Sequence, residues 1–105
     1  MRIDGTLVRK DGQSHEEFLR YWENEHAPIA KELPGLVKYT IDYPTAPEKS
    51  AYDGIAQLYF EDMQALKEAF TSEAGEKVQE DATNFIDVEQ GPTLYLEESV
   101  QVDYV

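Results

Sequence analysis

The sequence contains no cysteine among its 105 residues. Without a thiol there can be no disulfide, no thiolate nucleophile and no thiolate-bound zinc or iron–sulfur cluster. A chain of this length supports one hydrophobic core, so we expect a single domain over residues 1–105 that is stabilised by packing.

Long apolar runs are absent as well. No segment approaches the stretch of about 18 apolar residues that a membrane-spanning helix needs. The N-terminal stretch MRIDGTLVRKDG also lacks the apolar centre of a signal peptide. The sequence therefore predicts a soluble, cytoplasmic protein that does not bind a membrane.

Basic residues are scarce. Nine Lys and Arg face 22 Asp and Glu, which gives a formal net charge of −13. This negative field repels nucleic acid, so we expect no nucleic-acid partner. The excess of acid fits either a halophilic protein in a high-salt cytoplasm, where salt screens the self-repulsion, or simply an acidic mesophilic protein. Acidic clusters such as EKVQED, residues 76–81, are expected to be solvated surface.

The apolar pattern predicts the order strand, helix, strand, strand, helix, strand. The first helix begins at a capping box formed by Ser14 and Glu17. This order is that of an α+β, ferredoxin-like βαββαβ protomer, an antiparallel sheet with its helices on one face. If the bare face is apolar it needs a cover, so we expect a homodimer. The expected elements are strand 2–10, helix 14–33, strand 36–43, strand 54–60, a helical region 62–85 and strand 86–99.

The first helix carries one histidine on its apolar stripe. Pro28 lacks an amide hydrogen, so the carbonyl of Asn24 loses its helical partner and we expect a kink or break beside His26. His26 is then either a general acid/base or a buried histidine that is hydrogen-bonded to the freed carbonyl, and the sequence leaves both open. The stripe consists of Phe18, Trp22, His26, Ile29 and Leu33, spaced 4, 4, 3 and 4 apart.

A metal site is not expected. Glu23 and His26 have the E-x-x-H spacing of di-iron helix bundles, but such a site needs the motif twice. His15 is the only other histidine, and roughly 16 Å of helix separates it from His26. We therefore expect His15 to be a solvated residue of the first turn.

Tyr39 is the second catalytic candidate. It lies in a strand that alternates cleanly, with Val37, Tyr39, Ile41 and Tyr43 on the face predicted to be half-buried. A phenol in an apolar pocket can donate a hydrogen bond to a developing enolate oxygen, although a strand tyrosine can also simply fill the core. The residues expected to line the pocket are Phe18, Trp22, Ile41, Tyr43 and Tyr59.

The stretch YWENEHAPIAKELPGL, residues 21–36, combines the aromatic pair Tyr21 and Trp22 with His26, Pro28 and a following LPGL. With the later YDGIAQLYFEDMQALKEAFTS and DATNFID, it resembles the EthD-like family of small dimeric α+β barrel proteins, from residue 2 to about residue 99. The resemblance implies a ferredoxin-like protomer whose sheet pairs with that of a second copy in a dimeric α/β barrel.

The resemblance also implies chemistry. Relatives in the superfamily include cofactor-free aromatic polyketide cyclases, muconolactone isomerases and quinone-forming monooxygenases. In the isomerising relatives a histidine at the position of His26 and a tyrosine near that of Tyr39 lie at the pocket; no second pocket histidine is evident here.

Two functions follow from this resemblance. The first is an enzyme without metal or organic cofactor that acts on a small apolar, aromatic or lactone-like carbonyl compound, by proton transfer, isomerisation, cyclisation or oxidative degradation. The other is a non-catalytic binding or accessory protein that supports a catabolic oxidative enzyme. A haem-linked role, found in the wider superfamily, is a third alternative.

Overall fold

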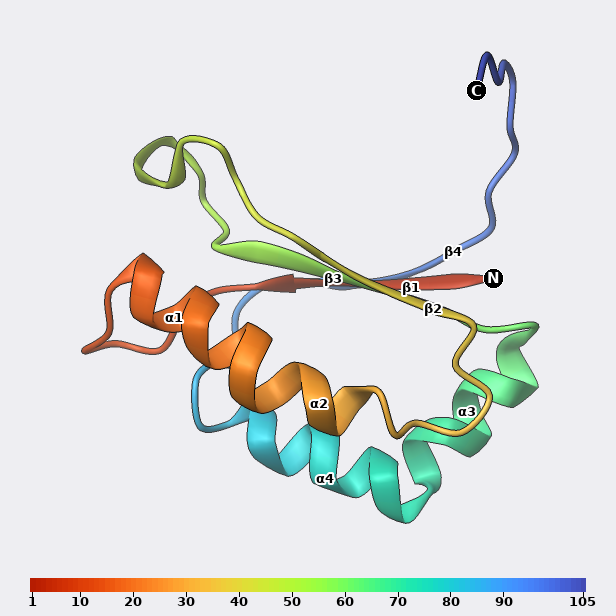
Figure 1. Ribbon diagram of the computed structural model, residues 1–105, viewed down its shortest axis with the longest axis horizontal. Helices are drawn as coiled ribbons and strands as arrows, with labels where there is room; N and C mark the ends of the chain where they lie inside the picture. Colours follow the sequence, from red (N-terminus) through yellow and green to blue (C-terminus); the bar gives the residue numbers. More distant parts are fainter.

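The computed structural model describes residues 1–105 and has a four-stranded antiparallel sheet with its α-helices on one face only (Figure 1). The predicted α+β, ferredoxin-like fold is confirmed. None of the helices has the length and apolar character that crossing a bilayer requires. The elements are β1 (Arg2–Leu7), α1 (His15–Tyr21), η1 (Trp22–His26), α2 (Ala27–Ala30), β2 (Lys38–Asp42), η2 (Pro47–Lys49), β3 (Gly54–Tyr59), α3 (Met63–Thr71), α4 (Glu73–Ala82) and β4 (Thr93–Leu96).

The sheet has the strand order β2-β3-β1-β4, so β3 and β1 are central and β2 and β4 are the edges. All three pairings are antiparallel. The register places Ile3 opposite Leu58, and both side chains are buried in the core beneath the sheet. Because directly paired residues share a face, this pair identifies the side of the sheet that the helices cover.

The first helix contains a π-helical turn. It starts at the predicted capping box, where Ser14 Oγ accepts from the Glu17 amide and the Glu17 carboxylate accepts from the Ser14 amide. Over η1 the amide of Ala27 donates to the carbonyl of Trp22, five residues earlier. The helix is therefore widened beside His26 rather than broken there, and α2 continues to Ala30. Turns of this kind are frequent at functional sites.

Two apolar clusters form the core. One lies under β1 and β3 and includes Leu66 from α3 and Val78 from α4. The other joins α1 and η1 to the end of α4 through the fully buried rings of Phe18, Trp22 and Phe85. This second cluster holds the π-helical turn between the sheet on one side and α4 on the other.

All four strands are shorter than the sequence predicts, and β4 most of all. The expected strand 86–99 is reduced to β4, and Ile86 makes only a single bridge to Arg9, because Gly91 takes a left-handed φ of 86° and turns the chain before Pro92. Strand β2 ends at Asp42, so the prediction that Val37 and Tyr43 lie on a half-buried face is wrong. These two residues lie beyond the paired section and are 71% and 55% exposed.

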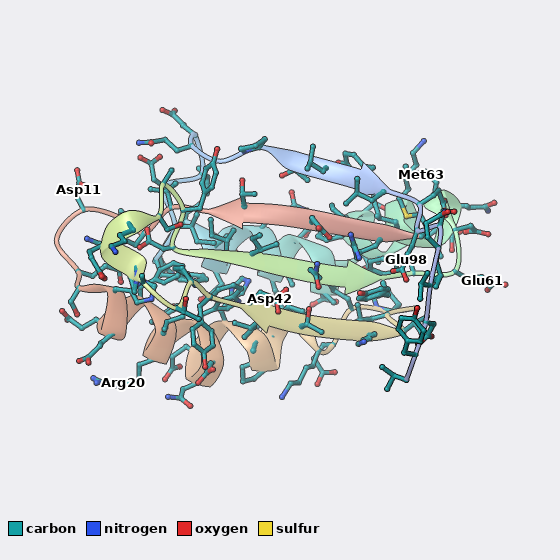
Figure 2. All side chains as sticks on the ribbon, turned by 90° about the horizontal axis from the view of Figure 1, so that it is seen from above. Asp11, Arg20, Asp42, Glu61, Met63 and Glu98 are labelled. Atoms are coloured by element: carbon teal, nitrogen blue, oxygen red, sulfur yellow. The ribbon has the colours of Figure 1, made fainter.

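The uncovered face of the sheet, onto which Figure 2 looks, is more polar than expected. Along its middle, Arg2 Nε lies 2.8 Å from Asp4 Oδ1, and Gln57 accepts a hydrogen bond from Thr40. Apolar side chains flank this polar row on β4, where Leu94 pairs with Asp4 and Leu96 pairs with Arg2. We refer to this side as the open face.

The chain ends in an extended arm, residues 97–105. In Figure 1 it leaves the end of β4 and runs away from the body on the side opposite the helices. Apolar side chains recur at every second position, and Val100, Val102 and Tyr104 are 62%, 63% and 97% exposed. The arm has the alternation of a strand and buries none of these side chains in its own chain.

Candidate functional site

A groove runs between the first helix and the edge strand β2. It has a volume of about 280 Å³, and its lining consists of Glu23, Ala27, Lys31, Tyr39 and Ile41. The three helical residues are spaced four apart, and the two strand residues alternate with residues of the open face, so both rows point into the same space. The structure thus brings the predicted Tyr39 and Ile41 together with Glu23 and Lys31, two lining residues that the sequence did not indicate.

The hydroxyl oxygen of Tyr39 accepts a hydrogen bond from Trp22. The indole Nε1 of Trp22 donates to the Tyr39 oxygen at 2.9 Å. An indole N–H can only donate, so the phenol oxygen accepts and its own hydrogen stays available. Burial raises the pKa of Tyr39 to about 12, against the opposing effect of the Trp22 hydrogen bond. Tyr39 is therefore a neutral hydrogen-bond donor at neutral pH.

His26 is directed at α4. Its Nδ1 lies 2.7 Å from Asp81 Oδ2, and its ring centroid is 4.8 Å from that of Phe85. The prediction that a buried His26 would serve the carbonyl freed by Pro28 is wrong, since its partner is a carboxylate on another helix. His26 is also not among the residues that line the groove, and no hydrogen bond joins it to Tyr39.

Asp81 is the centre of a small polar network. Its second oxygen, Oδ1, accepts from the Tyr21 hydroxyl at 2.8 Å and from Asn84 Nδ2 at 3.2 Å. Burial by itself would raise the pKa of Asp81, but the hydrogen bonds from His26, Tyr21 and Asn84 outweigh it and lower the pKa. The carboxylate is thus ionised and engaged, and the expectation that the cluster 76–81 is only solvated surface is wrong at this position.

The Asp81 carboxylate leaves one ring nitrogen of His26 free. With Nδ1–H directed at Asp81, Nε2 becomes the nitrogen that can exchange a proton. It makes no hydrogen bond within the chain and is not among the fully buried polar atoms that lack a partner, so it keeps contact with solvent. The contact with Asp81 thus fixes the imidazole in one orientation.

Trp22 lies between the two candidate catalytic residues, Tyr39 and His26. Its ring packs on the start of β3 so closely that a Cβ at Gly54 would collide with it. The π-helical turn thus directs Trp22 toward the sheet and His26 toward α4. Phe18 and Trp22 are fully buried in the core behind the groove.

Two other predicted lining residues lie elsewhere. Tyr43 lines a separate pocket of about 220 Å³ that also contains Tyr52. Tyr59 pairs with Arg2 and Lys38 and lies on the open face, where both cations sit over its ring. The prediction that Tyr59 joins Tyr39 in one pocket is wrong because the strand register puts the two on opposite faces.

His15 is not a solvated residue. Its side chain is only 15% exposed, and its Nδ1 lies 3.2 Å from Asp53 Oδ1. Asp53 also accepts from the amide of Arg9 at 2.8 Å and from Arg9 Nη1 at 2.7 Å. Burial works to raise the pKa of Asp53, while the hydrogen bonds from Arg9 and His15 bring it below its ordinary value. Sequence reasoning missed this second Asp–His pair because its members are 38 residues apart.

The two histidines differ in one respect. His15 Nε2 is fully buried and lacks a partner, whereas His26 Nε2 is not sealed off. The structure gathers no cluster of three or more His, Cys, Asp or Glu side chains that can hold a metal ion.

Comparison with known proteins finds matches over most of the chain. A family model of the EthD domain matches residues 10–89. An uncharacterized 11.0 kDa protein from the thcB-thcC intergenic region of Rhodococcus erythropolis is 28% identical over 83 residues, which are 76% of this chain and 80% of that protein.

Solved structures of the same fold also match. An EthD family protein from Bacillus halodurans superposes with a TM-score of 0.76 at 21% identity, over 94% of this chain and 100% of its own. A DABB family protein with a ferredoxin-like fold from Mesorhizobium loti gives a TM-score of 0.66 at 14% identity, over 93% and 96% of the two chains. At these sequence identities the two structures support the fold assignment alone.

Proposed function

The chain belongs to the EthD family, and we propose that it is a cofactor-independent enzyme that binds a small apolar carbonyl compound in the groove between the first helix and β2. The observation that carries this proposal is the Tyr39 hydroxyl, a buried neutral phenol whose oxygen is occupied by Trp22 and whose hydrogen remains free. A donor of this kind suits a carbonyl oxygen that gains negative charge during a reaction.

The proposed reaction is a proton transfer next to that carbonyl. A base removes a proton from the neighbouring carbon, the electron pair moves to the oxygen, and Tyr39 stabilises the resulting enolate by its hydrogen bond. Return of the proton to a different carbon gives an isomer, so the atoms balance without an oxidant. One well-placed donor of this type lowers the activation free energy by about 3 kcal/mol.

Two groups compete for the role of the base in this proposal. His26 is the predicted one, and Asp81 supports it because the carboxylate is ionised and fixes the ring through Nδ1 with Nε2 free. Glu23 is the competitor, since it lines the groove and His26 does not. The two assignments make different predictions for single variants, which the following experiment uses.

The experiment measures deuterium incorporation in D₂O, by proton NMR, into a panel of unsaturated γ-lactones and aryl ketones. For a substrate that the wild type exchanges, Tyr39→Phe should lower the rate about a hundredfold, the equivalent of about 3 kcal/mol. Tyr95→Phe is the matched control, because that tyrosine is 57% exposed on β4. A Tyr39→Phe variant that exchanges like the wild type would contradict the proposal.

The base is assigned in the same assay. His26→Gln should abolish most of the exchange and Glu23→Gln should leave it within about threefold if His26 is the base. The reverse pattern would transfer the role to Glu23.

A second candidate function is non-catalytic binding of the same class of molecule, in support of an oxidative enzyme. The orientation of the His26 ring favours it, because the ring is turned onto Asp81 and does not line the groove. Under this alternative a ligand binds and shifts the fluorescence of Trp22, no exchange occurs, and His26→Gln leaves the affinity unchanged.

We also propose a homodimer formed through the open face and the C-terminal arm. Leu94 on the open face and Val100, Val102 and Tyr104 on the arm are exposed apolar side chains, which is the kind of surface that a second copy covers. Sedimentation analysis should give a dimer for the full chain and a monomer after deletion of residues 100–105. A wild type that sediments as a monomer at micromolar concentration would refute this assembly.

A further inference from the structure

The largest pocket described lies away from the groove, beyond the C-terminal end of β1. It has a volume of about 610 Å³ and is bounded by the β1–α1 loop, the first residue of α1 and the segment that leads into β3. Its lining is mostly polar and includes Arg9, Lys10, His15 and Asp53. This pocket is not part of the proposed reaction site, so its contents need their own explanation.

Arg9 is rigidly held in the wall of this pocket. Its Nη1 donates to Asp53 and its Nε donates to the carbonyl of Gln13 at 3.0 Å. The other terminal nitrogen, Nη2, has no partner in the chain, and the side chain is 42% exposed. A guanidinium that is fixed on one edge and free on the other is already arranged to bind an oxyanion without further loss of side-chain entropy.

One further cation lies beside Arg9 in the lining. Lys10 Nζ donates one hydrogen bond, to the carbonyl of Thr83 at 3.1 Å, and has other hydrogens to give. His15 also forms part of the wall, but its Nδ1 faces the Asp53 carboxylate and its Nε2 is fully buried, so it offers no donor to a ligand.

The pocket also contains acidic side chains. Arg9 and Asp53 neutralise each other in their ion pair, which leaves Lys10 against Asp11 and Glu48. The charged side chains of the lining therefore carry a net charge of −1, two positive against three negative, and repel ligands with several negative charges. A ligand with a single negative charge is repelled least, and a flat carboxylate can bind the planar edge of Arg9 by directed hydrogen bonds.

We propose that this pocket is a second ligand site, which binds a small monocarboxylate through Arg9, with Lys10 as an additional donor. The site is independent of the groove, so its failure would leave the proposed reaction untouched.

The test is a titration of the ¹⁵N-labelled full chain with sodium acetate at constant ionic strength, followed by amide chemical shifts. Amides of residues 9–13 and 48–53 should shift saturably, with a Kd on the order of millimolar. Neutral acetamide should cause no saturable shift, and citrate should bind more weakly than acetate.

Variants identify the residues. Arg9→Gln should weaken acetate binding about tenfold. Because this change also frees Asp53, a second variant, Lys10→Gln, tests the site with less effect on the fold and should weaken binding about threefold. Arg20→Gln is the control, since it removes one positive charge from an exposed position outside the pocket lining.

Three outcomes would overturn the proposal. Acetate shifts that do not saturate, or that chloride reproduces, would mean that no site exists. Unchanged affinity in both Arg9→Gln and Lys10→Gln would remove the assigned donors. Tighter binding of inorganic phosphate than of acetate would assign the pocket to another class of anion.

Discussion

Replacing Asp81 by asparagine removes the charge on which His26, Tyr21 and Asn84 converge. The His26 and Asp81 side chains are only 8% and 13% exposed, so the pair is shielded from water and salt. A hydrogen bond to a charged group contributes about 1.5–3 kcal/mol, and the substitution changes the three that Asp81 accepts. The asparagine keeps one oxygen that can accept from Tyr21, so we expect a loss of about 3 kcal/mol in total.

The assay is urea unfolding followed by the fluorescence of Trp22, which is the only tryptophan and is fully buried. With an m-value of about 1.5 kcal/mol/M, a loss of about 3 kcal/mol lowers the midpoint by about 2 M. The control is Glu80→Gln, which makes the same change from acid to amide at the preceding, exposed residue of α4. Its effect should stay within about 0.5 kcal/mol.

The stability that Asp81 contributes should depend on pH in a definite direction. The pKa of Asp81 is lower in the folded protein than its ordinary value, so its stabilisation is present above about pH 4 and is lost as the pH falls through the folded pKa. The gap between wild type and Asp81→Asn should therefore be largest near neutral pH and should narrow below about pH 4. A gap no larger than that of Glu80→Gln at pH 7, or one that persists in acid, would refute this reasoning.

Three further predictions concern the core and the groove. Phe85→Ala should destabilise by about 3–5 kcal/mol in urea, because the ring is fully buried and contacts both Phe18 and His26; a loss below 1 kcal/mol would contradict the packing. Gly54→Ala should lower the free energy of unfolding by about 1–3 kcal/mol and shift the Trp22 emission, because a Cβ at this position collides with the Trp22 ring. Gly5→Ala is the control: its Cβ meets only Leu7 Cδ2, at 3.9 Å, so neither the stability nor the emission should change. In an ultraviolet pH titration the difference between wild type and Tyr39→Phe should show a phenol that ionises near pH 12, and a midpoint near 10 would mean that the hydroxyl is not buried.

Features set by neighbouring residues could be predicted from the sequence. The capping box needs only Ser14 and Glu17, which are one turn apart, and the stripe that buries Phe18 and Trp22 follows from helical spacing. The inward position of Tyr39 follows from alternation along a strand in the same way.

Features set by distant residues could not be predicted. Asp81 and Asp53 lie 55 and 38 residues from the histidines that they bind, and nothing in the local pattern marks them among 22 acidic residues. The face of Tyr59 depends on which residue of β1 it meets, and a shift of one residue in register would reverse it. The π-helical turn lets Trp22 pack on the sheet and His26 contact α4 at the same time. Both contacts are made with residues far away in the sequence, so they exist only in the folded structure.

The C-terminal arm has the alternation of a strand, and the outer edge of β2 has no partner strand in the sheet. In the proposed homodimer, two copies that exchange arms about a two-fold axis would use both arms and both β2 edges and form a closed pair. If the same exchange failed to close, every added copy would present a new vacant β2 edge, and growth would continue into a filament. In such an assembly the angle at which the arm leaves β4 would decide between a finite particle and a polymer.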